Sequence, residues 1–337
     1  MRSGEAEVYV CPACKQGMQL RVVQQLGEAV VAGTLACRCG AEFPIADGIP
    51  DLVFPRQLAA SDLEAKLWYD ANADVYDENL HLTFDTFGED ENNVRNRLVD
   101  RLSLQPTHRV LELGAGSGRD SLLIADRLGS EGRLYLQDLS LAILRHSFPK
   151  LATKPVPTEF HVGNACNLPF ADGVFDAVFH FGGLNTFSDI GAFFSEINRV
   201  SKVGGKVVVG DESMPVWLRN TEFGRVLMNS NPLYRYELPL RHLPVSCREV
   251  KLEWIIGGVF YVIEYRVGEG EPFADLDFEI PGVRGGSHRT RYYGLLEGVT
   301  PEAKAMAQAA SANSGKSLHR WLDEAVRQAA ARDLEGK

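Results

Sequence analysis

The sequence lacks the long hydrophobic runs that a membrane protein needs. No stretch of its 337 residues approaches the roughly 18 consecutive apolar residues of a membrane-spanning helix. The first residues, MRSGEAEVYVCP, contain no apolar core of a secretory signal, so we expect a cytoplasmic protein. A basic excess is also missing, since 35 Lys and Arg stand against 45 Asp and Glu, a formal net charge of −10. Because polyanions are usually bound by basic surfaces, this balance disfavours nucleic acid as the main substrate.

Cysteine is scarce and unevenly distributed. In a protein of the cytosol, clustered cysteines indicate metal ligation rather than disulfides. Valine-rich runs at 20–23 and 29–32 predict a hairpin with a cysteine pair at each end. So short a segment cannot bury a large core, and four converging thiolates suit a structural, tetrahedral zinc ion; buried thiols without metal are the alternative. The four clustered cysteines are Cys11, Cys14, Cys37 and Cys39.

Strand and helix signals alternate along the middle of the chain. Such alternation implies a parallel sheet covered by helices on both faces. Strand signals occupy residues 109–113, 133–138, 159–162, 174–180 and 206–210, and helical signals occupy 117–128, 139–147 and 190–200.

Two further strands are predicted at 250–256 and 259–267, separated only by two glycines. A two-glycine connection predicts an antiparallel hairpin. Residues 60–282 are therefore expected to form an α/β, Rossmann-like domain, in which a seven-stranded, mostly parallel sheet ends in an antiparallel hairpin.

The C-terminal stretch has a different pattern. Residues 289–297 are predicted to form a strand, Thr300 and Pro301 to begin a helix that ends near Asn313, and Ser317 to cap a second helix. A strand and two helices alone cannot form a stable core. The second helix has one continuous apolar stripe, made of Leu318, Trp321, Leu322, Ala325, Val326 and Ala329.

This stretch resembles ribbon-helix-helix modules, which fold as intertwined dimers. The resemblance implies a homodimer formed through residues 286–334. DNA binding through Arg289 and Arg291 is the alternative, but from Arg289 onward eight Lys and Arg stand against six Asp and Glu, a weak surplus.

A glycine-rich loop follows the first predicted strand of the middle region. Glycines permit positive φ angles and let a ligand approach the backbone closely. The spacing is G-x-G-x-G, with Arg119 where a dinucleotide site has its third glycine, so the usual pyrophosphate geometry is not expected. A tight turn without ligand is the alternative. The segment comprises Glu112, Gly114, Ala115, Gly116 and Gly118.

An acidic residue, Asp138, ends the second predicted strand. A carboxylate at this place can accept both hydroxyls of a ribose. The alternative role for Asp138 is to cap the next helix, in competition with Ser140. Together with the glycine loop, Asp138 favours a nucleotide-like ligand.

Residues 163–176, GNACNLPFADGVFD, follow the third strand. They resemble the G-D-A-x-x-L-P-F-x-D-x-x-F-D signature of class I methyltransferases, closest to the branch of ubiquinone and menaquinone C-methyltransferases. Residues 196–206, EINRVSKVGGK, resemble the E-x-x-R-V-L-K-P-G-G-x segment of that branch. Residues 68–77, WYDANADVYD, are similar to its N-terminal lid over the cofactor.

The resemblance implies S-adenosylmethionine as the cofactor. It assigns the methionine part to Glu112 and the 114–118 loop, the ribose to Asp138, and the adenine to Asn164 with the Ala165 amide. The family usually has Asp where this chain has Asn164, whose carbonyl oxygen can still accept from the adenine amino group. The complete expected set is Tyr69, Tyr76, Glu112, Gly114, Ala115, Gly116, Gly118, Asp138, Leu139, Asn164 and Ala165.

Catalytic candidates are His180, Asn185 and Tyr76. Methyl transfer mainly requires alignment of donor and acceptor, and a base is needed only if the acceptor loses a proton. The alternative for His180 is a packed strand residue, and His161 is expected in the core. Aromatic residues between 214 and 245 are candidates to cover a flat or apolar acceptor, with plain packing as the alternative.

Residues 42–52, EFPIADGIPDL, resemble the end of the zinc-ribbon domain of the tRNA-methyltransferase activator, which also precedes several bacterial methyltransferases. This implies a closed, non-catalytic zinc site within residues 1–56. The leading hypothesis is methylation of a small, apolar or aromatic molecule. An RNA or tRNA methyltransferase is the first alternative, although residues 1–60 hold five Lys and Arg against six Asp and Glu. A DNA-binding regulator is the second.

Overall fold

A computed structural model describes residues 1–293 and 299–335 of the chain. The chain divides into two compact units, Met1–Glu271 and Pro272–Lys337, which are described separately. Within the described residues, no helix is long and apolar enough to cross a membrane.

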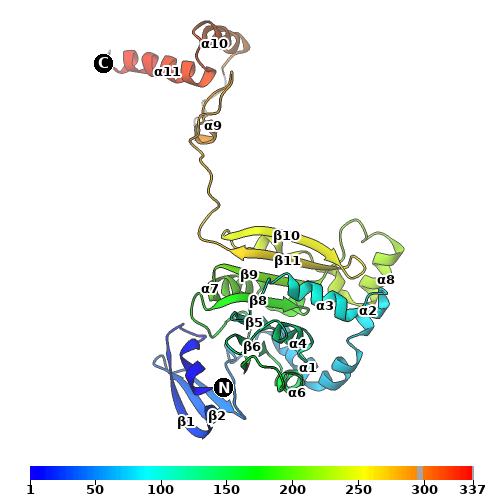
Figure 1. Cartoon of the computed structure of the whole chain (residues 1–337). Coiled ribbons are helices and arrows are strands. Elements are labelled where there is room, and N and C mark those ends of the chain that lie inside the picture. The colour runs from blue at the N-terminus through cyan, green and yellow to red at the C-terminus, as the bar shows by residue number, and fades with distance from the viewer. Residues whose placement is uncertain (294–298, 336–337) are drawn as a thin grey trace. The chain divides into compact units, whose positions relative to one another are not determined.

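The first unit is built on a seven-stranded sheet with the order β10-β11-β9-β8-β5-β6-β7. Figure 1 shows the strands stacked from β10 to β6. Neighbours from β9 to β7 are parallel, whereas β11 is antiparallel to both β9 and β10, which confirms the expected fold class. The strands are β5 (Arg109–Leu113), β6 (Arg133–Asp138), β7 (Thr158–Val162), β8 (Phe175–Phe181), β9 (Ser201–Glu212), β10 (Cys247–Ile255) and β11 (Phe260–Val267).

Helices and short helical turns surround this sheet. The predicted helix at 117–128 begins later, since Gly118 caps it with a left-handed φ of 82°. The predicted helix at 139–147 is two short helices, α5 and α6. The helices are α1 (Ala60–Asn79), α2 (Leu82–Thr86), α3 (Glu91–Asp100), α4 (Arg119–Ala125), α5 (Leu141–Leu144), α6 (Ser147–Leu151), α7 (Ile190–Val200) and α8 (Glu222–Ser230), with 3-10 turns η1 (Ser3–Val8), η2 (Leu184–Thr186), η3 (Pro232–Arg235) and η4 (Pro239–His242).

Alternate strand residues divide the core between the two faces of the sheet. Leu111 and Leu113 of β5 pack in one buried cluster with Phe193 and Ile197 of α7. Val110, the neighbour of Leu111 in the strand, belongs to a second cluster with residues of α3 and α4. Because side chains of a strand alternate between faces, the sheet is covered on both sides, as the strand–helix alternation predicts.

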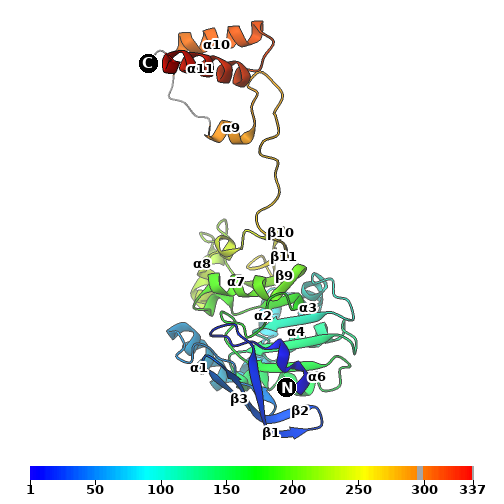
Figure 2. The ribbon, with the colours of Figure 1, turned by 90° about the vertical axis from the view of Figure 1, so that its left-hand side faces the viewer.

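The N-terminal segment forms a four-stranded antiparallel sheet that packs within the first unit. The predicted hairpin is confirmed as β1 (Met18–Leu26) with β2 (Ala29–Cys37), followed by β3 (Glu42–Ala46) and β4 (Ile49–Pro50). Tyr9 bridges to Phe170, and Asp51 bridges to Val162, so this segment touches β7 and the loop after it. Figure 2 shows the N-terminal sheet, in blue, at the lower end of the first unit.

The second unit is helical in its described residues: α9 (His288–Tyr293), α10 (Pro301–Asn313) and α11 (Leu318–Glu335). The helices after Thr300 and Ser317 are confirmed, and both residues accept bonds from the first helical turn. The strand predicted from residue 289 is wrong for 289–293, which are helical, and residues 294–298 lie outside the described part.

The cause of that error is a helix cap. The Ser287 hydroxyl accepts from the Thr290 amide at 3.2 Å, and the Ser287 amide donates to the Thr290 hydroxyl at 2.8 Å. This reciprocal pair satisfies amides at the start of a helix. Arg289 pairs with Asp277, and Arg291 donates to the Gly285 carbonyl, rather than alternating along a strand.

Candidate active site

A cavity, here called cavity A, opens at the carboxyl ends of the parallel strands beneath α1. It has about 740 Å³ of empty space, including its open mouth. Ligand sites of open α/β sheets lie at this edge, because the loops that follow the strands converge there. Its lining includes Asp62, Tyr69, Tyr76, Gly114, Gly116, Asp138, Leu139, Asn164, Ala165 and His180.

The glycine loop forms the floor of cavity A. Gly114 and Gly116 have φ angles of 59° and 52°, which side chains rarely tolerate. A Cβ atom at Gly114 would lie 3.2 Å from Cε1 of His180, so the close approach of loop and strand depends on this glycine. Gly118 differs, because its Cβ would lie 2.5 Å from that of Ser147 in α6. Gly118 therefore serves helix packing and does not line cavity A.

Asp138 lines cavity A. One carboxylate oxygen accepts from the Gly116 amide at 2.9 Å, and the other accepts from the Ser140 amide at 2.9 Å. Ser140, not Asp138, caps α5 through its hydroxyl. Burial raises the pKa of Asp138 to about 6, although the backbone amides lower it. The carboxylate keeps acceptor capacity for ligand hydroxyls.

Asn164 and Ala165 line the cavity one strand further along, after β7. The Asn164 side chain accepts from the Cys166 amide at 2.9 Å and donates to Asp62 at 3.2 Å. Asp62, in the first turn of α1, was not anticipated from the sequence. It is buried, and it also accepts from the amide and hydroxyl of Ser188.

Helix α1 carries two tyrosines over the cavity. Tyr69 and Tyr76 pack edge to face, with ring centroids 5.2 Å apart. Burial raises the pKa of Tyr76 to about 12, so its hydroxyl stays protonated at neutral pH. Both line cavity A.

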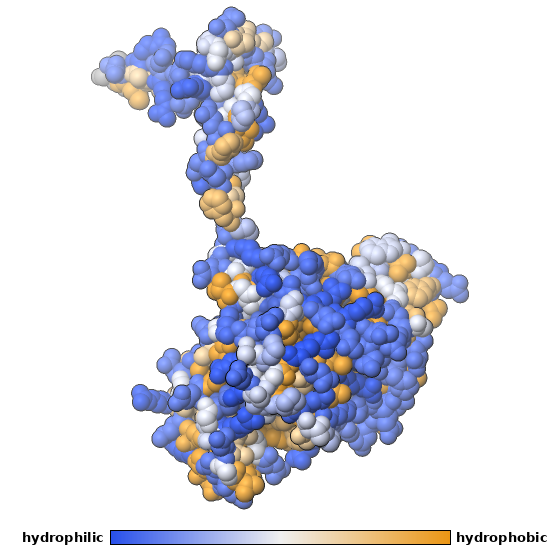
Figure 3. All heavy atoms as spheres, viewed as in Figure 1, coloured by the Kyte–Doolittle hydropathy of each residue, from blue (hydrophilic) through white to orange (hydrophobic). Residues whose placement is uncertain are grey.

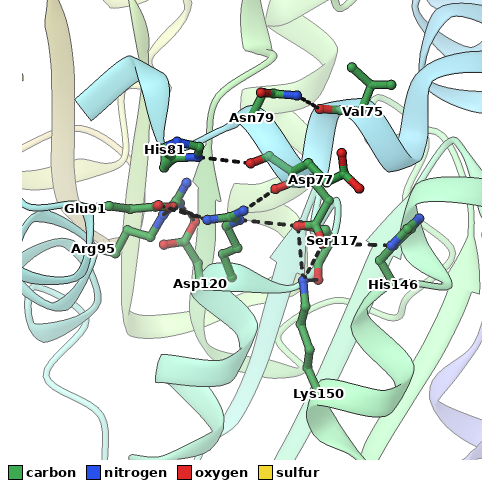
Figure 4. Close-up of polar contacts among 12 residues, drawn as sticks. Val75, Asp77, Asn79, His81, Glu91, Arg95, Ser117, Asp120, His146 and Lys150 are labelled. Carbon is green, nitrogen blue, oxygen red and sulfur yellow. Dashed lines mark hydrogen bonds and ion pairs between the residues drawn. The ribbon is translucent and has the colours of Figure 1, made fainter. Parts of the chain in front are cut away.

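The end of α1 is fixed by charge to the helix after the glycine loop. Asp77 pairs with Arg119 at 3.3 Å. It also pairs with Lys150 at 3.1 Å, as Figure 4 shows. Arg119 also bonds Glu91 of α3 at 2.9 Å. Burial opposes ionisation of Asp77, but Ser117, Lys150 and Arg119 outweigh it and keep the pKa low. Arg119, which replaces the third glycine of a dinucleotide loop, thus anchors the end of α1.

His180 is fully buried at the end of β8 and lines cavity A. Its Nδ1 lies 2.9 Å from the Leu113 carbonyl, which can only accept, so Nδ1 carries the proton. Among the described residues Nε2 has no partner. Burial lowers the pKa of His180, so the ring is a neutral acceptor.

Asn185 lines neither cavity A nor the second cavity that adjoins it. Its side-chain amide donates to the Glu212 carbonyl at 2.8 Å, so Asn185 fixes the end of β9.

His161 is confirmed as a core residue, fully buried against Tyr9 and Phe170. Glu112 is buried beneath the glycine loop, where one oxygen has no partner among the described residues. Burial, then the charge of Asp120, raises the pKa of Glu112.

A second cavity, cavity B, adjoins cavity A. The two share Tyr76, Gly114, Gly116, Phe181 and Gly182 as lining residues. Cavity B has about 610 Å³ of empty space with its mouth. Apolar and charged side chains both line this cavity, and one of the charged groups, the Glu212 carboxyl, was not anticipated. The lining includes the apolar Phe84, Ala115, Ile256 and Phe260 and the charged Arg95, Arg119, Asp120 and Glu212.

Glu212 ends β9 with one buried oxygen that has no hydrogen-bond partner among the described residues. Burial, then the neighbouring charge of Asp211, raises its pKa well above the ordinary value. The aromatic residues predicted as a cover line neither cavity in the described part of the chain; Tyr234 is buried, and Trp217 is exposed.

The four N-terminal cysteines converge, although the pairs are far apart in sequence. Their sulfur atoms all lie within 4.8 Å of one another. The Cys11 and Cys39 sulfurs are 3.7 Å apart, and those of Cys14 and Cys37 are 3.4 Å apart. Tetrahedral zinc with Zn–S bonds of about 2.3 Å requires sulfurs about 3.8 Å apart. The donor set and spacing fit a zinc ion.

Comparisons with known proteins agree on one family. Residues 111–209 match the family described as "Methyltransferase domain". Demethylmenaquinone methyltransferase of Streptomyces avermitilis is 32% identical over 171 residues, which cover 50% of this chain and 69% of that protein. The ubiquinone/menaquinone biosynthesis C-methyltransferase of Cupriavidus pinatubonensis is 32% identical over 44% of this chain and 57% of that protein.

Demethylmenaquinone methyltransferase of Beutenbergia cavernae is 37% identical over 36% of this chain and 48% of that protein. The chain thus spans about half the length of several curated relatives that it matches. Among solved structures, phosphoethanolamine N-methyltransferase 2 of Haemonchus contortus aligns with a TM-score of 0.49 at 14% identity, over 75% of this chain and 69% of that chain.

Proposed function

Since the chain belongs to the class I S-adenosylmethionine-dependent methyltransferases, we propose that it transfers a methyl group to a small, apolar or aromatic acceptor. The observation that carries this proposal is the junction of two cavities at Gly114, Gly116 and Tyr76. One cavity is suited to the cofactor, and the other is suited to an acceptor.

In this proposal, cavity A holds S-adenosylmethionine, whose sulfonium supplies an electrophilic methyl group. Asp138 accepts the ribose hydroxyls beside the Gly116 amide, and Leu139 and Ala165 border the adenine. Tyr69 and Tyr76 line this cavity, and the face of an aromatic ring favours a cation such as the sulfonium. The Glu112 side chain does not line the cavity. In this proposal it therefore acts on the methionine part through the glycine loop and not by direct contact.

Cavity B receives the acceptor. Phe84, Ile256 and Phe260 suit an apolar or planar molecule, which is the usual character of a small-molecule site. Glu212 offers a hydrogen bond to an acceptor hydroxyl, and His180, whose Nε2 has no partner among the described residues, lines cavity A. Asn185 positions β9 rather than touching the acceptor.

The test is methyl transfer by the full chain from methyl-labelled S-adenosylmethionine. We expect label in a low-mass, solvent-extractable fraction of a metabolite extract. Label in added tRNA or total RNA instead would support the RNA alternative. Asp138→Ala should abolish most S-adenosylhomocysteine binding in calorimetry; unchanged binding would contradict the ribose assignment.

We also propose one structural zinc ion on Cys11, Cys14, Cys37 and Cys39. The cysteine loops lie against the domain that carries the site: the Lys15 ammonium donates to the Leu168 carbonyl at 3.1 Å, and the Val10 amide donates to the Pro169 carbonyl at 2.9 Å. The site is closed by protein sulfurs, which suits a structural role. Metal analysis should find one zinc per chain, and Cys14→Ser with Cys37→Ser should lose it.

We also propose a homodimer formed through the C-terminal unit, for a reason other than strand pairing. Residues 289–293 of the predicted strand are helical, so strand pairing does not support it. Support comes from α11, in which none of the 18 described residues is buried. On the face of the first unit shown in Figure 3, apolar residues lie in small groups among hydrophilic ones. A second copy of the C-terminal unit is the occupant that we propose for the apolar side of α11.

A further inference from the structure

The acidic side chain of Asp62 lies where three separate segments meet at cavity A. It comes from the first turn of α1, Asn164 from the loop after β7, and Ser188 from the loop before α7. Asp62 is 5% exposed and lines the cavity with Asn164. Among the described residues, the three groups that donate to it are the Asn164 amino group and the Ser188 amide and hydroxyl. All three are neutral, so none of these bonds is an ion pair.

Asn164 is held in one orientation by its neighbours. A backbone amide can only donate, so the atom 2.9 Å from the Cys166 amide is the Asn164 carbonyl oxygen. The Asn164 amino group consequently faces Asp62, at 3.2 Å. Asn164 thus turns its acceptor back into its own loop and its donor toward the carboxylate.

Asp62 retains one place for a further donor. A carboxylate has about four acceptor positions. The Asn164 amino group and the Ser188 hydroxyl, at 3.2 and 2.6 Å, occupy two on Oδ2, and the Ser188 amide, at 2.9 Å, occupies one on Oδ1. The remaining position is on Oδ1.

We propose that Asp62 is the specificity-determining residue for the purine of the cofactor, accepting a hydrogen bond from its exocyclic amino group. This inference rests on the proposed cofactor site in cavity A. Asn164 is then a positioning residue that aims the carboxylate, and the lid helix α1 itself reads the base. An aspartate at position 164 would place two carboxylates in contact.

The experiment compares two ligands by calorimetry with the full chain: S-adenosylhomocysteine, and S-inosylhomocysteine, in which a carbonyl replaces the amino group. The wild-type chain should prefer the adenine ligand by at least about tenfold, since a charge-assisted bond would be exchanged for repulsion between two acceptors. Equal binding of the two ligands by the wild-type chain would overturn the proposal without any variant.

Asp62→Asn supplies a donor and should bring the two affinities close to equality. Asp62→Asn combined with Asn164→Asp moves the charge across the hydrogen bond and should restore the preference for adenine. Ser188→Ala is the matched control: it removes a bond to the same carboxylate and should leave the ligand ratio unchanged.

Two failures are distinguishable. If Asp62 only holds the Ser188 loop, Asp62→Asn will weaken both ligands by the same factor, and the proposal is overturned. If the wild-type chain binds neither ligand, the cofactor site itself is wrong.

Discussion

At the scale of single residues, the proposed contact of Asp138 with the ribose predicts that cofactor binding depends on pH. Its pKa is raised to about 6, mainly by burial, and the ribose hydroxyls need the ionised form as acceptor. Affinity for S-adenosylhomocysteine should therefore be constant above pH 7 and fall as the pH drops through 6, to about a tenth at pH 5. Calorimetry across this range measures the effect.

The matched variant is Asp138→Asn, which cannot ionise. It should bind more weakly at pH 7 and show no comparable change between pH 7 and 5. A wild-type affinity that stays constant down to pH 5 would show that the ionised Asp138 does not hold the ligand.

A second prediction at the scale of residues concerns the effect of His161 on the free energy of unfolding. Burial lowers the pKa of His161 to about 3, and neither ring nitrogen has a partner among the described residues. Between pH 6.5 and 3 the unfolded chain binds a proton there and the folded chain does not, so this group makes stability fall as the pH falls. The contribution is about 1.4 kcal/mol per pH unit.

Urea unfolding of His161→Phe at several pH values should show a shallower loss of stability toward acid than the wild type. Tyr9→Phe is the control, since it removes from the same cluster a hydroxyl that has no partner among the described residues, and it changes no titration in this range. Parallel pH profiles for wild type and His161→Phe would contradict the assignment.

Some site residues could be predicted because they follow strands, whereas others are distant in sequence and come together only in the folded chain. Asp138 and Asn164 follow strands, and the carboxyl ends of parallel strands meet at one edge, so their place at cavity A was predictable. Asp62 lies 102 residues from Asn164 and 126 from Ser188, and no local pattern connects them. Glu212 was likewise missed, because an acidic residue after a strand is ordinary until its burial is known.

At the scale of elements, helices and strands were predicted correctly where apolar periodicity or a capping residue marks them in the sequence. The parallel strands and α7 follow from apolar periodicity, and α10 and α11 follow from Thr300 and Ser317 as caps. The helix α9 was mistaken for a strand because 289–297 is rich in aromatic and aliphatic residues. Its Ser287–Thr290 cap uses a hydroxyl where the familiar pattern has Glu or Gln, so the signal was missed.

A substitution at Gly118 tests how closely the glycine loop packs against α4 and α6. Alanine there would need a φ of 82° and would place its Cβ 2.5 Å from that of Ser147. Left-handed backbone costs about 1–2 kcal/mol, and overpacking adds about 1–3 kcal/mol. Gly118→Ala should therefore destabilise the fold by about 2–5 kcal/mol in urea unfolding.

Gly173→Ala isolates the backbone contribution. Gly173 has a φ of 65°, and no atom of the described residues beyond its chain neighbours lies within 4 Å of the place that an alanine Cβ would take. Only the smaller cost of about 1–2 kcal/mol is therefore expected. Equal destabilisation by the two substitutions would show that α6 yields to the added methyl group.

At the scale of the whole molecule, the chain joins an active-site unit, which includes the cysteine-bearing sheet, to a C-terminal helical unit. The first unit contains both cavities and the cysteine cluster. The three predicted domains, 1–56, 60–282 and 286–334, remain a proposal about independent folding. Contacts of Tyr9 and Lys15 with the loop after β7 favour cooperative unfolding of the first two.

The dimer proposal can be tested on the intact chain as well as by truncation. A chain of residues 1–271 should be monomeric in light scattering, whereas the full chain should be dimeric. In the full chain, Leu322→Glu with Val326→Glu places two charges on the apolar side of α11, where both side chains are partly exposed, and should yield monomers. Gln328→Glu, on the opposite side of the helix, should leave the dimer intact. A dimer that persists in the truncated chain would place the interface in the first unit, and a monomeric wild type would remove the proposed partner of α11.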